Sequence, residues 1–250
     1  MHFFRIFFVA LAAAATISSV SVLAQERTAV RQGFSLPANS GKAILLFRPT
    51  VRVGSQSTAG MFEPNADWTA QGREQLGTSL KNLQSRLGNR VIEAPEPVGE
   101  EALFLSEHMS LFAAVSTSVI NYQFFVGNRL PTKKQDNRND VFEWTLGPQV
   151  AQLPGAADAD YGLFIYTEDQ YGSTGRKLLQ FAAAFAGVGV QSGVHSGYAG
   201  LVDLKTGELL WLNADGQMGG DVRTSEGAEK RMRQLLEEFP GSVIEEAKAL

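Results

Sequence analysis

The sequence predicts an α/β (α+β) protein: a single mixed β-sheet covered by helices, with a C-terminal β-hairpin followed by a packing helix. Strand-like and helix-like segments alternate over most of the chain, which favours parallel strand pairs. Near the C-terminus, two alternating apolar runs flank the short turn Lys205-Thr206-Gly207, which favours an antiparallel hairpin. An amphipathic segment then follows the hairpin. We therefore expect a largely parallel core with an antiparallel edge.

The first 24 residues are typical of an export signal. Arg5 precedes an apolar run over residues 6–23, and Val22 and Ala24 occupy the positions that a signal peptidase reads when it cleaves after Ala24. The run approaches the length of a bilayer span, so a transmembrane anchor is the alternative. Its second half is rich in Ala and Ser and only weakly hydrophobic, which favours cleavage and a periplasmic or secreted protein.

Composition excludes several classes of function. The chain has no cysteine, so disulfides, thiol nucleophiles, thiolate metal sites and a cysteine-linked lipid anchor are ruled out. Its formal net charge of −4 makes it a poor nucleic-acid binder, because such proteins need a basic surface against phosphates. No internal repeat or linker divides it. We expect a flexible lead over residues 25–42, one domain over 43–240 and a tail over 241–250.

The first half of the domain is predicted as strand, helix, strand, helix. Residues 43–47 and 51–53 form a buried strand interrupted at Pro49, which cannot donate to a ladder. After a polar loop, Asp67 caps a helix that ends before Gly88. The core side of this helix is a leucine stripe: Leu76, Leu80, Leu83 and Leu87.

The middle of the domain has weaker patterns. Val91 lies in a short second strand, and a second helix over residues 100–121 carries His108 inside its apolar stripe. Residues 127–140 are polar and rich in turn formers, so we expect a mobile loop. An edge strand over residues 141–146 and two helical turns over 147–153 follow.

The last third contains the strongest signals. Residues 161–166 form an apolar strand, a polar turn over 167–175 follows, and residues 176–190 form a helix that is apolar on almost every face. Such a helix must be buried or meet another apolar surface. After the hairpin, Ser225 caps the final helix. The expected core face of that helix is Ala228, Met232, Leu235, Leu236 and Phe239.

Few residues could carry catalysis. Glu168 and Asp169 follow the apolar strand, where sites of α/β proteins often gather, and His195 lies among small residues in an expected loop. Polar loop ends and an inert loop histidine are the simpler interpretation. Arg176 follows Gly172-Ser-Thr-Gly175, whose amides could hold an anion, although a capped strand-to-helix turn explains the same residues. No Gly-x-Ser-x-Gly elbow is present, and we expect no cofactor and no metal.

Three segments carry a family resemblance. Ala159-Asp160-Tyr161, the hairpin from Leu201 to Trp211, and Gly220-Asp-Val-Arg-Thr-Ser-Glu-Gly-Ala228 resemble segments of small α/β proteins of the bacterial envelope. These include the curli-secretion lipoproteins, the outer-membrane activator of a penicillin-binding protein, the N-terminal domain of the Tol-system translocation protein, and uncharacterised putative lipoproteins. The resemblance implies a non-catalytic assembly, activator or transport accessory. Unlike many members, this chain lacks the cysteine for a lipid anchor.

Three functional hypotheses follow. The first is an exported accessory protein that docks an unidentified envelope protein partner, with Glu168, Asp169, Arg176, His195 and Trp211 as candidate surface residues. The second is a hydrolase or metal-dependent enzyme that uses Glu168, Asp169 and His195. The third is a homo-oligomer that contacts the membrane through residues 178–197. The exposure of Trp211 decides between two roles of the hairpin. An exposed indole favours a docking surface, and a buried indole means that the hairpin is only part of the scaffold.

Overall fold

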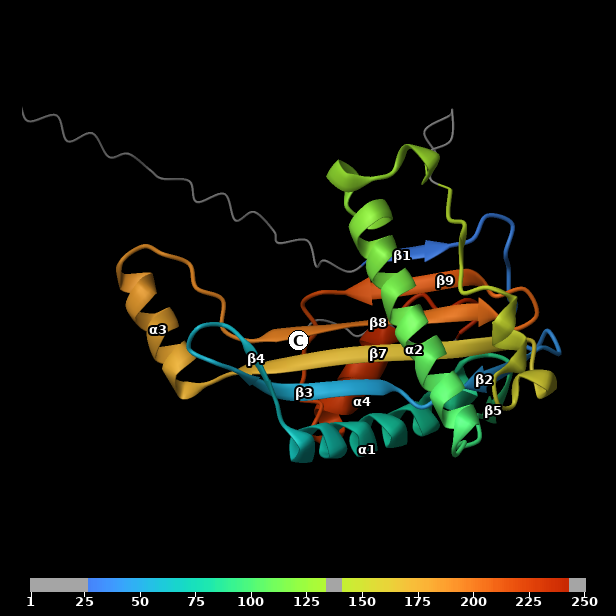
Figure 1. Cartoon of the computed structure of the whole chain (residues 1–250), viewed down its shortest axis with the longest axis horizontal. Coiled ribbons are helices and arrows are strands. Elements are labelled where there is room, and N and C mark those ends of the chain that lie inside the picture. The colour runs from blue at the N-terminus through green and yellow to red at the C-terminus, as the bar shows by residue number, and fades with distance from the viewer. Residues whose placement is uncertain (1–26, 134–140, 243–250) are drawn as a thin grey trace, which may run out of the picture.

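The computed structural model describes residues 27–133 and 141–242 (Figure 1). Its nine strands are β1 (Arg27–Val30), β2 (Ala43–Leu46), β3 (Thr50–Gln56), β4 (Phe62–Pro64), β5 (Arg90–Glu93), β6 (Trp144–Thr145), β7 (Tyr161–Gly172), β8 (Val194–Asp203) and β9 (Glu208–Asp215). Its α-helices are α1 (Ala66–Leu83), α2 (Glu100–Val119), α3 (Thr174–Phe185) and α4 (Ser225–Leu235). A π-helical turn, Ile120–Phe124, extends α2.

All described strands belong to one mixed sheet, as predicted, with the order β5-β2-β7-β8-β9-β1. Strands β2 and β5 run parallel to each other, and β2 and β3 both run parallel to β7. Strands β7, β8, β9 and β1 are successively antiparallel, and β4 and β6 pair antiparallel with β3 and β9. The antiparallel part is larger than the edge we expected. The reason is that β7 and β8 continue well beyond the predicted strands and pair from Tyr161 opposite Asp203 to Gln170 opposite Val194.

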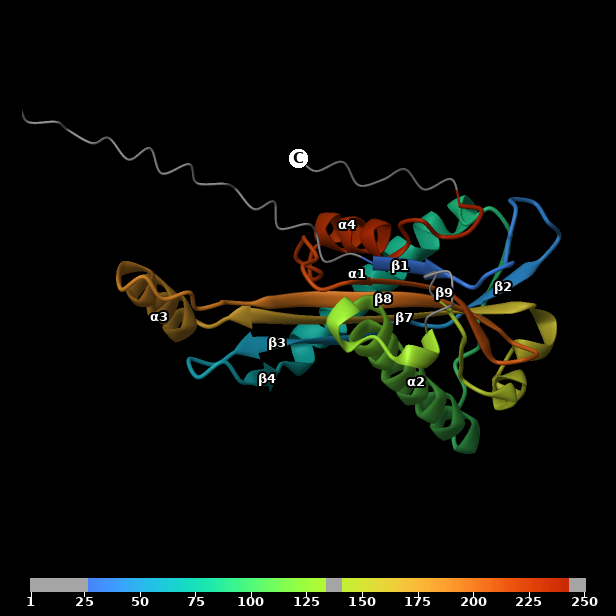
Figure 2. The ribbon, with the colours of Figure 1, turned by 90° about the horizontal axis from the view of Figure 1, so that it is seen from above.

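Helices cover both faces of the sheet. Figure 2 shows α1 and α4 on one side and α2 on the other, while α3 projects from one end. The first core lies between the sheet and the α1/α4 pair, and it contains the four predicted leucines of the first helix and the five predicted core residues of the last. The second core lies beneath α2 and is rich in aromatic residues.

The helix caps differ by one or two positions from the predictions. Asn65, not Asp67, caps α1, because its Oδ1 accepts a hydrogen bond from the Trp68 backbone N–H at 2.9 Å. Thr224, not Ser225, caps α4 in the same way through Gly227.

The hairpin turn is confirmed. Gly207 has φ +78°, and its N–H donates to the Asp203 carbonyl at 2.8 Å. A Cβ at Gly207 would lie 2.0 Å from the Gly147 carbonyl oxygen, so only glycine fits.

Three predictions about the N-terminal and middle segments need correction or lie outside the described residues. The flexible lead is wrong at Arg27–Val30, which forms edge strand β1 against β9. The edge strand at residues 141–146 shrinks to β6, and the expected helical turns are a 3-10 helix, Pro148–Gln152. The signal segment, residues 134–140 of the predicted loop, and residues 243–250 of the tail lie outside the described residues.

One further prediction around β7 is wrong, and another loses one of its two alternatives. The polar turn expected at residues 167–175 is mostly strand, because Thr167 and Asp169 find buried polar partners on the sheet face. The following helix is predicted to be buried or to meet another apolar surface, and no residue of α3 is buried. Its apolar side chains face outward, so contact with another apolar surface is the alternative that stays a prediction.

The segment Glu100–Phe124 is long and apolar enough to cross a membrane by length and composition alone. Core helices of soluble proteins pass the same test. Here α2 packs across the sheet through His108, Phe112, Ser116 and Val119, which are buried. Much of its remaining surface borders a cavity or solvent.

Candidate functional site

The five candidate residues do not form one site. Asp169 and His195 are brought together, because their strands pair at that position. Glu168 is the neighbour of Asp169 on β7 and therefore points to the opposite face of the sheet. The combination of Glu168, Asp169 and His195 that an enzyme would need does not converge.

Asp169 lies at the centre of a buried ionic network. Both side chains of the Asp169–Arg231 pair are fully buried, and two guanidinium nitrogens of Arg231 each lie 2.8 Å from a different carboxylate oxygen of Asp169. Arg231 also donates to the Thr167 hydroxyl at 2.6 Å. Such a two-point pair locks α4 against β7.

His195 lies at the edge of this network and contacts Asp169, but the two do not form a catalytic dyad. Its Nδ1 lies 2.5 Å from Asp169 Oδ1, and its ring packs edge-on against Tyr171 with centroids 5.1 Å apart. The Ser192 hydroxyl is buried and makes no hydrogen bond within the described residues, so it is not paired with the imidazole. Because Arg231 already holds both carboxylate oxygens, Asp169 acts as a structural counter-ion.

Arg231 is not among the residues singled out from sequence, because it lies among other charged residues of the last helix. Its neighbours Glu229, Lys230 and Arg233 suggest a solvated face. The available signal was its spacing, since Arg231 is three residues after Ala228 and four before Leu235, both of which are in the core.

A second polar cluster lies beside the network. Asp221 accepts two hydrogen bonds from the Arg223 guanidinium, at 2.9 and 2.7 Å, and one from the Tyr171 hydroxyl at 2.7 Å. Arg223 also lies over the rings of Trp68 and Tyr171, at 4.5 and 4.1 Å from the centroids. This cluster ties the loop before α4 to α1 and β7.

Asp221 gives the protein an acid-sensitive contribution to stability. Its hydrogen bond with Arg223 holds the pKa of the carboxyl well below its usual range. Because the folded pKa lies below the unfolded one, the contribution is complete above about pH 4 and is lost as the pH falls through the folded value. We expect Asp221→Asn to lower the free energy of unfolding by about 1 kcal/mol at neutral pH, since 35% of the side chain is exposed. Urea titrations should show that this difference disappears in acid; a constant difference would contradict the assignment.

The remaining candidates have structural partners. Arg176 donates to the carbonyls of Gln191 and Thr58, and its own N–H is capped by Ser173, which accounts for the turn without a bound anion. Trp211 is fully buried and packs edge-on against Phe239. The hairpin is therefore scaffold at this position. Within the described residues, no group of three potential metal ligands comes together.

One feature open to a ligand is a gap in the sheet. On the outer side of β2, strand β5 pairs only as far as Leu46 opposite Glu93, and on the outer side of β3, strand β4 begins to pair at Gly54. Among the described strands, residues 50–52 therefore pair only with β7, and residues 48–49 pair with none. Pro95 and Pro97 explain why β5 stops, because neither has an N–H to donate. We call this gap the notch.

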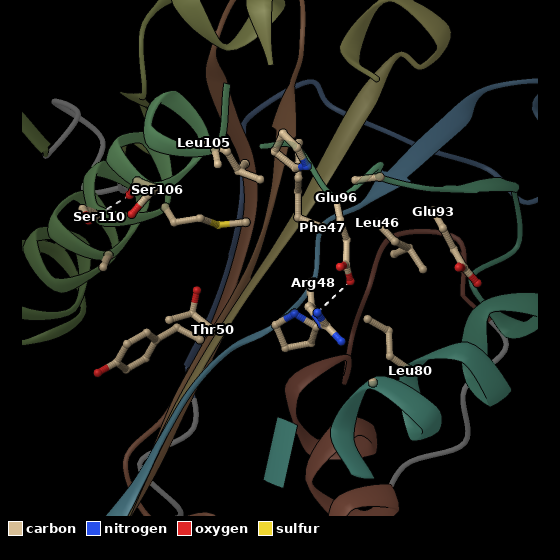
Figure 3. Close-up of a pocket in the computed structure, with 18 of the residues that line it drawn as sticks. Leu46, Phe47, Arg48, Thr50, Leu80, Glu93, Glu96, Leu105, Ser106 and Ser110 are labelled. Carbon is tan, nitrogen blue, oxygen red and sulfur yellow. Dashed lines mark hydrogen bonds and ion pairs between the residues drawn. The ribbon is translucent and has the colours of Figure 1, made fainter. Parts of the chain in front are cut away.

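The notch opens into a cavity of about 1060 Å³ (Figure 3). In the close-up, Leu105 and Ser106 of α2 lie on one side, Leu80 of α1 lies on the other, and Arg48 and Thr50 lie between them. Because a strand is missing, the cavity reaches both faces of the sheet. It joins the open side of α2 to the flank of α1.

The cavity is apolar inside and electrically balanced at its rim. Tyr166 and Tyr198 stack in its wall with ring centroids 4.8 Å apart, and burial raises the pKa of both hydroxyls. Three exposed cations at the rim are paired: Arg48 with Glu96 at 2.6 Å, Lys81 with Glu93 at 3.3 Å, and Arg52 with Glu168 at 2.8 Å. This lining favours a neutral, apolar occupant over a free anion.

The position of the notch could be predicted only in part from the sequence. Pro49, Pro95 and Pro97 are visible as strand breakers, and the interruption at Pro49 was predicted. That β2 and β3 follow one another along the same side of β7 was not predicted, because it depends on long-range pairing.

Comparisons with known proteins leave function open. No protein-family model matches the chain, and no curated protein matches its sequence. Among solved structures, it is similar to the PelC dodecamer of Paraburkholderia phytofirmans, at 11% identity and a TM-score of 0.35, over 88% of this chain and 99% of that one. A second crystal form of that dodecamer gives the same identity and TM-score. Likeness at this level carries no argument about function or assembly, and the resemblance to envelope families stays a prediction.

Proposed function

We propose that the protein is an exported, non-catalytic accessory of the cell envelope that docks a partner protein in the notch. The observation that carries the proposal is the notch itself, a stretch of β3 without an outer strand that opens into a large apolar cavity. The occupant is an extended segment of the partner. This proposal names a site and a mode of binding for the accessory role that the sequence suggests.

Strand addition fits the notch better than a small ligand does. An extended segment bonds to a free strand edge through its main chain, and its alternate side chains enter pockets on the two faces. The cavity offers that arrangement, since Leu80 and Leu105 line it from opposite sides of the strand. The Arg48–Glu96 pair at the entrance is largely exposed, so separating it costs at most about 1 kcal/mol.

An enzyme is the weaker candidate. The described acidic and histidine side chains that sequence singled out are separated by the sheet or held by Arg231. The cavity itself is lined by ion pairs, tyrosines, serines, threonines and apolar side chains, and no histidine lies among the described lining residues to activate a hydroxyl. These contacts favour binding over chemistry.

Gly77 provides a test that does not damage the fold. It lies on α1 and lines the cavity, and a Cβ there would meet nothing within 4 Å. We expect Gly77→Leu to raise the free energy of unfolding by about 0.5–1 kcal/mol, because glycine is a poor helix former. The same leucine fills the cavity and should abolish docking.

Docking can be measured by placing a photo-crosslinking residue at Ser110, an exposed position in the cavity lining. In cells, we expect a discrete adduct that disappears in the Gly77→Leu background. Gln71→Leu adds the same side chain to an exposed position of α1 outside the lining and should leave the adduct intact. An adduct of unchanged yield in Gly77→Leu, or none at Ser110, would contradict docking at this site.

A further inference from the structure

Helix α3 is amphipathic, but its apolar side faces solvent instead of the protein body. Its apolar stripe of Leu178, Phe181 and Phe185 follows the i, i+3, i+7 spacing, yet these side chains are 66%, 67% and 81% exposed. The opposite side holds Arg176, which bonds to carbonyl oxygens of the protein body. A surface helix usually packs its apolar face against the protein core. The apolar face of α3 has no such partner among the described residues, so we expect it to contact another molecule.

Other apolar side chains share this end of the molecule. The turn over residues 57–61 contacts the start of α3 through Arg176, and it carries Met61, which is 70% exposed. Val188, just after α3, is 55% exposed. Figures 1 and 2 both place α3 at one extreme of the long axis. We call α3, Val188 and Met61 the apolar tip.

The charge of the segment that contains α3 has one sign. No Asp or Glu occurs between Asp169 and Asp203, in a chain that is acidic overall. The same stretch contains Arg176 and Lys177 at the start of α3, and Lys177 is exposed. Outside this stretch, Glu63 lies two residues after Met61, is exposed and accepts a hydrogen bond from Ser55. An apolar helix face beside cations, in a segment without carboxylates, is complementary to an anionic lipid surface.

We propose that the apolar tip inserts into the interface of a phospholipid bilayer, with Phe181 and Phe185 among the acyl chains and Lys177 at the phosphate level. A projecting end suits this contact because it can enter a bilayer while the body stays in water. The notch lies away from α3, beside α1 and α2, and stays open in this orientation.

A second copy of the chain is a less suitable occupant. Symmetric pairing of two α3 stripes would bring the Lys177 side chains of both copies to one interface. It would also bring together two bodies of the same net charge. An anionic bilayer attracts Lys177 instead of repelling it, and only the tip has to approach it closely while the acidic body stays in water.

The test is vesicle flotation with the chain from Gln25 onward, which contains every residue that the structure describes. Vesicles of phosphatidylethanolamine and phosphatidylglycerol in a three-to-one mixture should bind it. Phe181→Gln combined with Phe185→Gln should weaken binding at least about tenfold, because two large apolar side chains are lost from the interface. Lys177→Gln should weaken it about fivefold on these vesicles and have no effect on neutral phosphatidylcholine vesicles.

The matched control removes two exposed apolar side chains elsewhere. Val98 and Leu103 are 83% and 62% exposed, and Val98→Gln with Leu103→Gln should leave binding unchanged. Circular dichroism should show that all variants fold, since none of these side chains is buried. Absent flotation, equal binding by the Phe181/Phe185 variant, or loss of binding in the control would overturn the proposal. So would light scattering showing that the Phe181/Phe185 variant dissociates an oligomer without changing flotation, because a second copy would then cover the tip.

Discussion

Replacement of Arg231 by methionine is expected to lower the free energy of unfolding by about 3–5 kcal/mol. The change leaves Asp169 fully buried with His195 and without its guanidinium partner. An uncompensated carboxylate in the core costs far more than the lost packing of an arginine stem, which methionine largely replaces. Guanidinium denaturation of the purified chain measures the effect.

The double variant Arg231→Met, Asp169→Leu is the control for this result. Once both charges are gone, no buried group is left unpaired, and we expect most of the lost stability to return. Arg233→Met removes a partly exposed arginine of the same helix, which pairs with Glu229, and should cost less than about 0.5 kcal/mol. If Arg231→Met and Arg233→Met cost the same, Arg231 does not neutralise a buried charge.

Trp211→Ala should have a comparable effect, about 3–5 kcal/mol, because the indole is fully buried in the core between the sheet and α1/α4. Removing it leaves a cavity beneath Phe239 that the sheet cannot close. Thermal unfolding followed by circular dichroism would measure the loss. A docking role predicts the opposite: little loss of stability and a loss of partner binding.

Trp211→Phe separates packing from hydrogen bonding. The indole nitrogen has no hydrogen-bond partner among the described residues, so replacing it should leave no polar group unpaired. We expect Phe at position 211 to recover more than half of the stability lost in the alanine variant. A phenylalanine variant as unstable as the alanine variant would mean that the indole nitrogen has a partner that matters.

Local patterns predicted the fold where packing follows sequence spacing. The leucine stripe of α1, the core face of α4 and the Gly207 turn each depend on neighbours within a few residues, and all three are confirmed. Strand lengths were predicted less well. Thr167 and Asp169 look like loop residues by composition, and only the distant Arg231 makes them stable in a buried strand.

At the candidate site, too, local patterns identified single residues, and long-range contacts determine their roles. Asp169 and His195 were singled out, but their role depends on Arg231, which is 62 residues from Asp169 in the sequence. Glu168 was grouped with Asp169 because they are adjacent, although adjacency on a strand places them on opposite faces. The notch arises from three strands that meet only in the folded sheet. For α3, composition indicated an apolar contact, but only the structure places that face outside.

Hydrogen exchange at residues 48–52 tests the central claim most directly. It would be measured in the free chain and in the complex recovered through the Ser110 crosslink. If the partner adds a strand to the notch, the outward-facing amide of Val51 should exchange at least about tenfold more slowly in the complex, since Pro49 has no N–H. Unchanged exchange at residues 48–52, in a complex that forms elsewhere on the surface, would contradict docking in the notch.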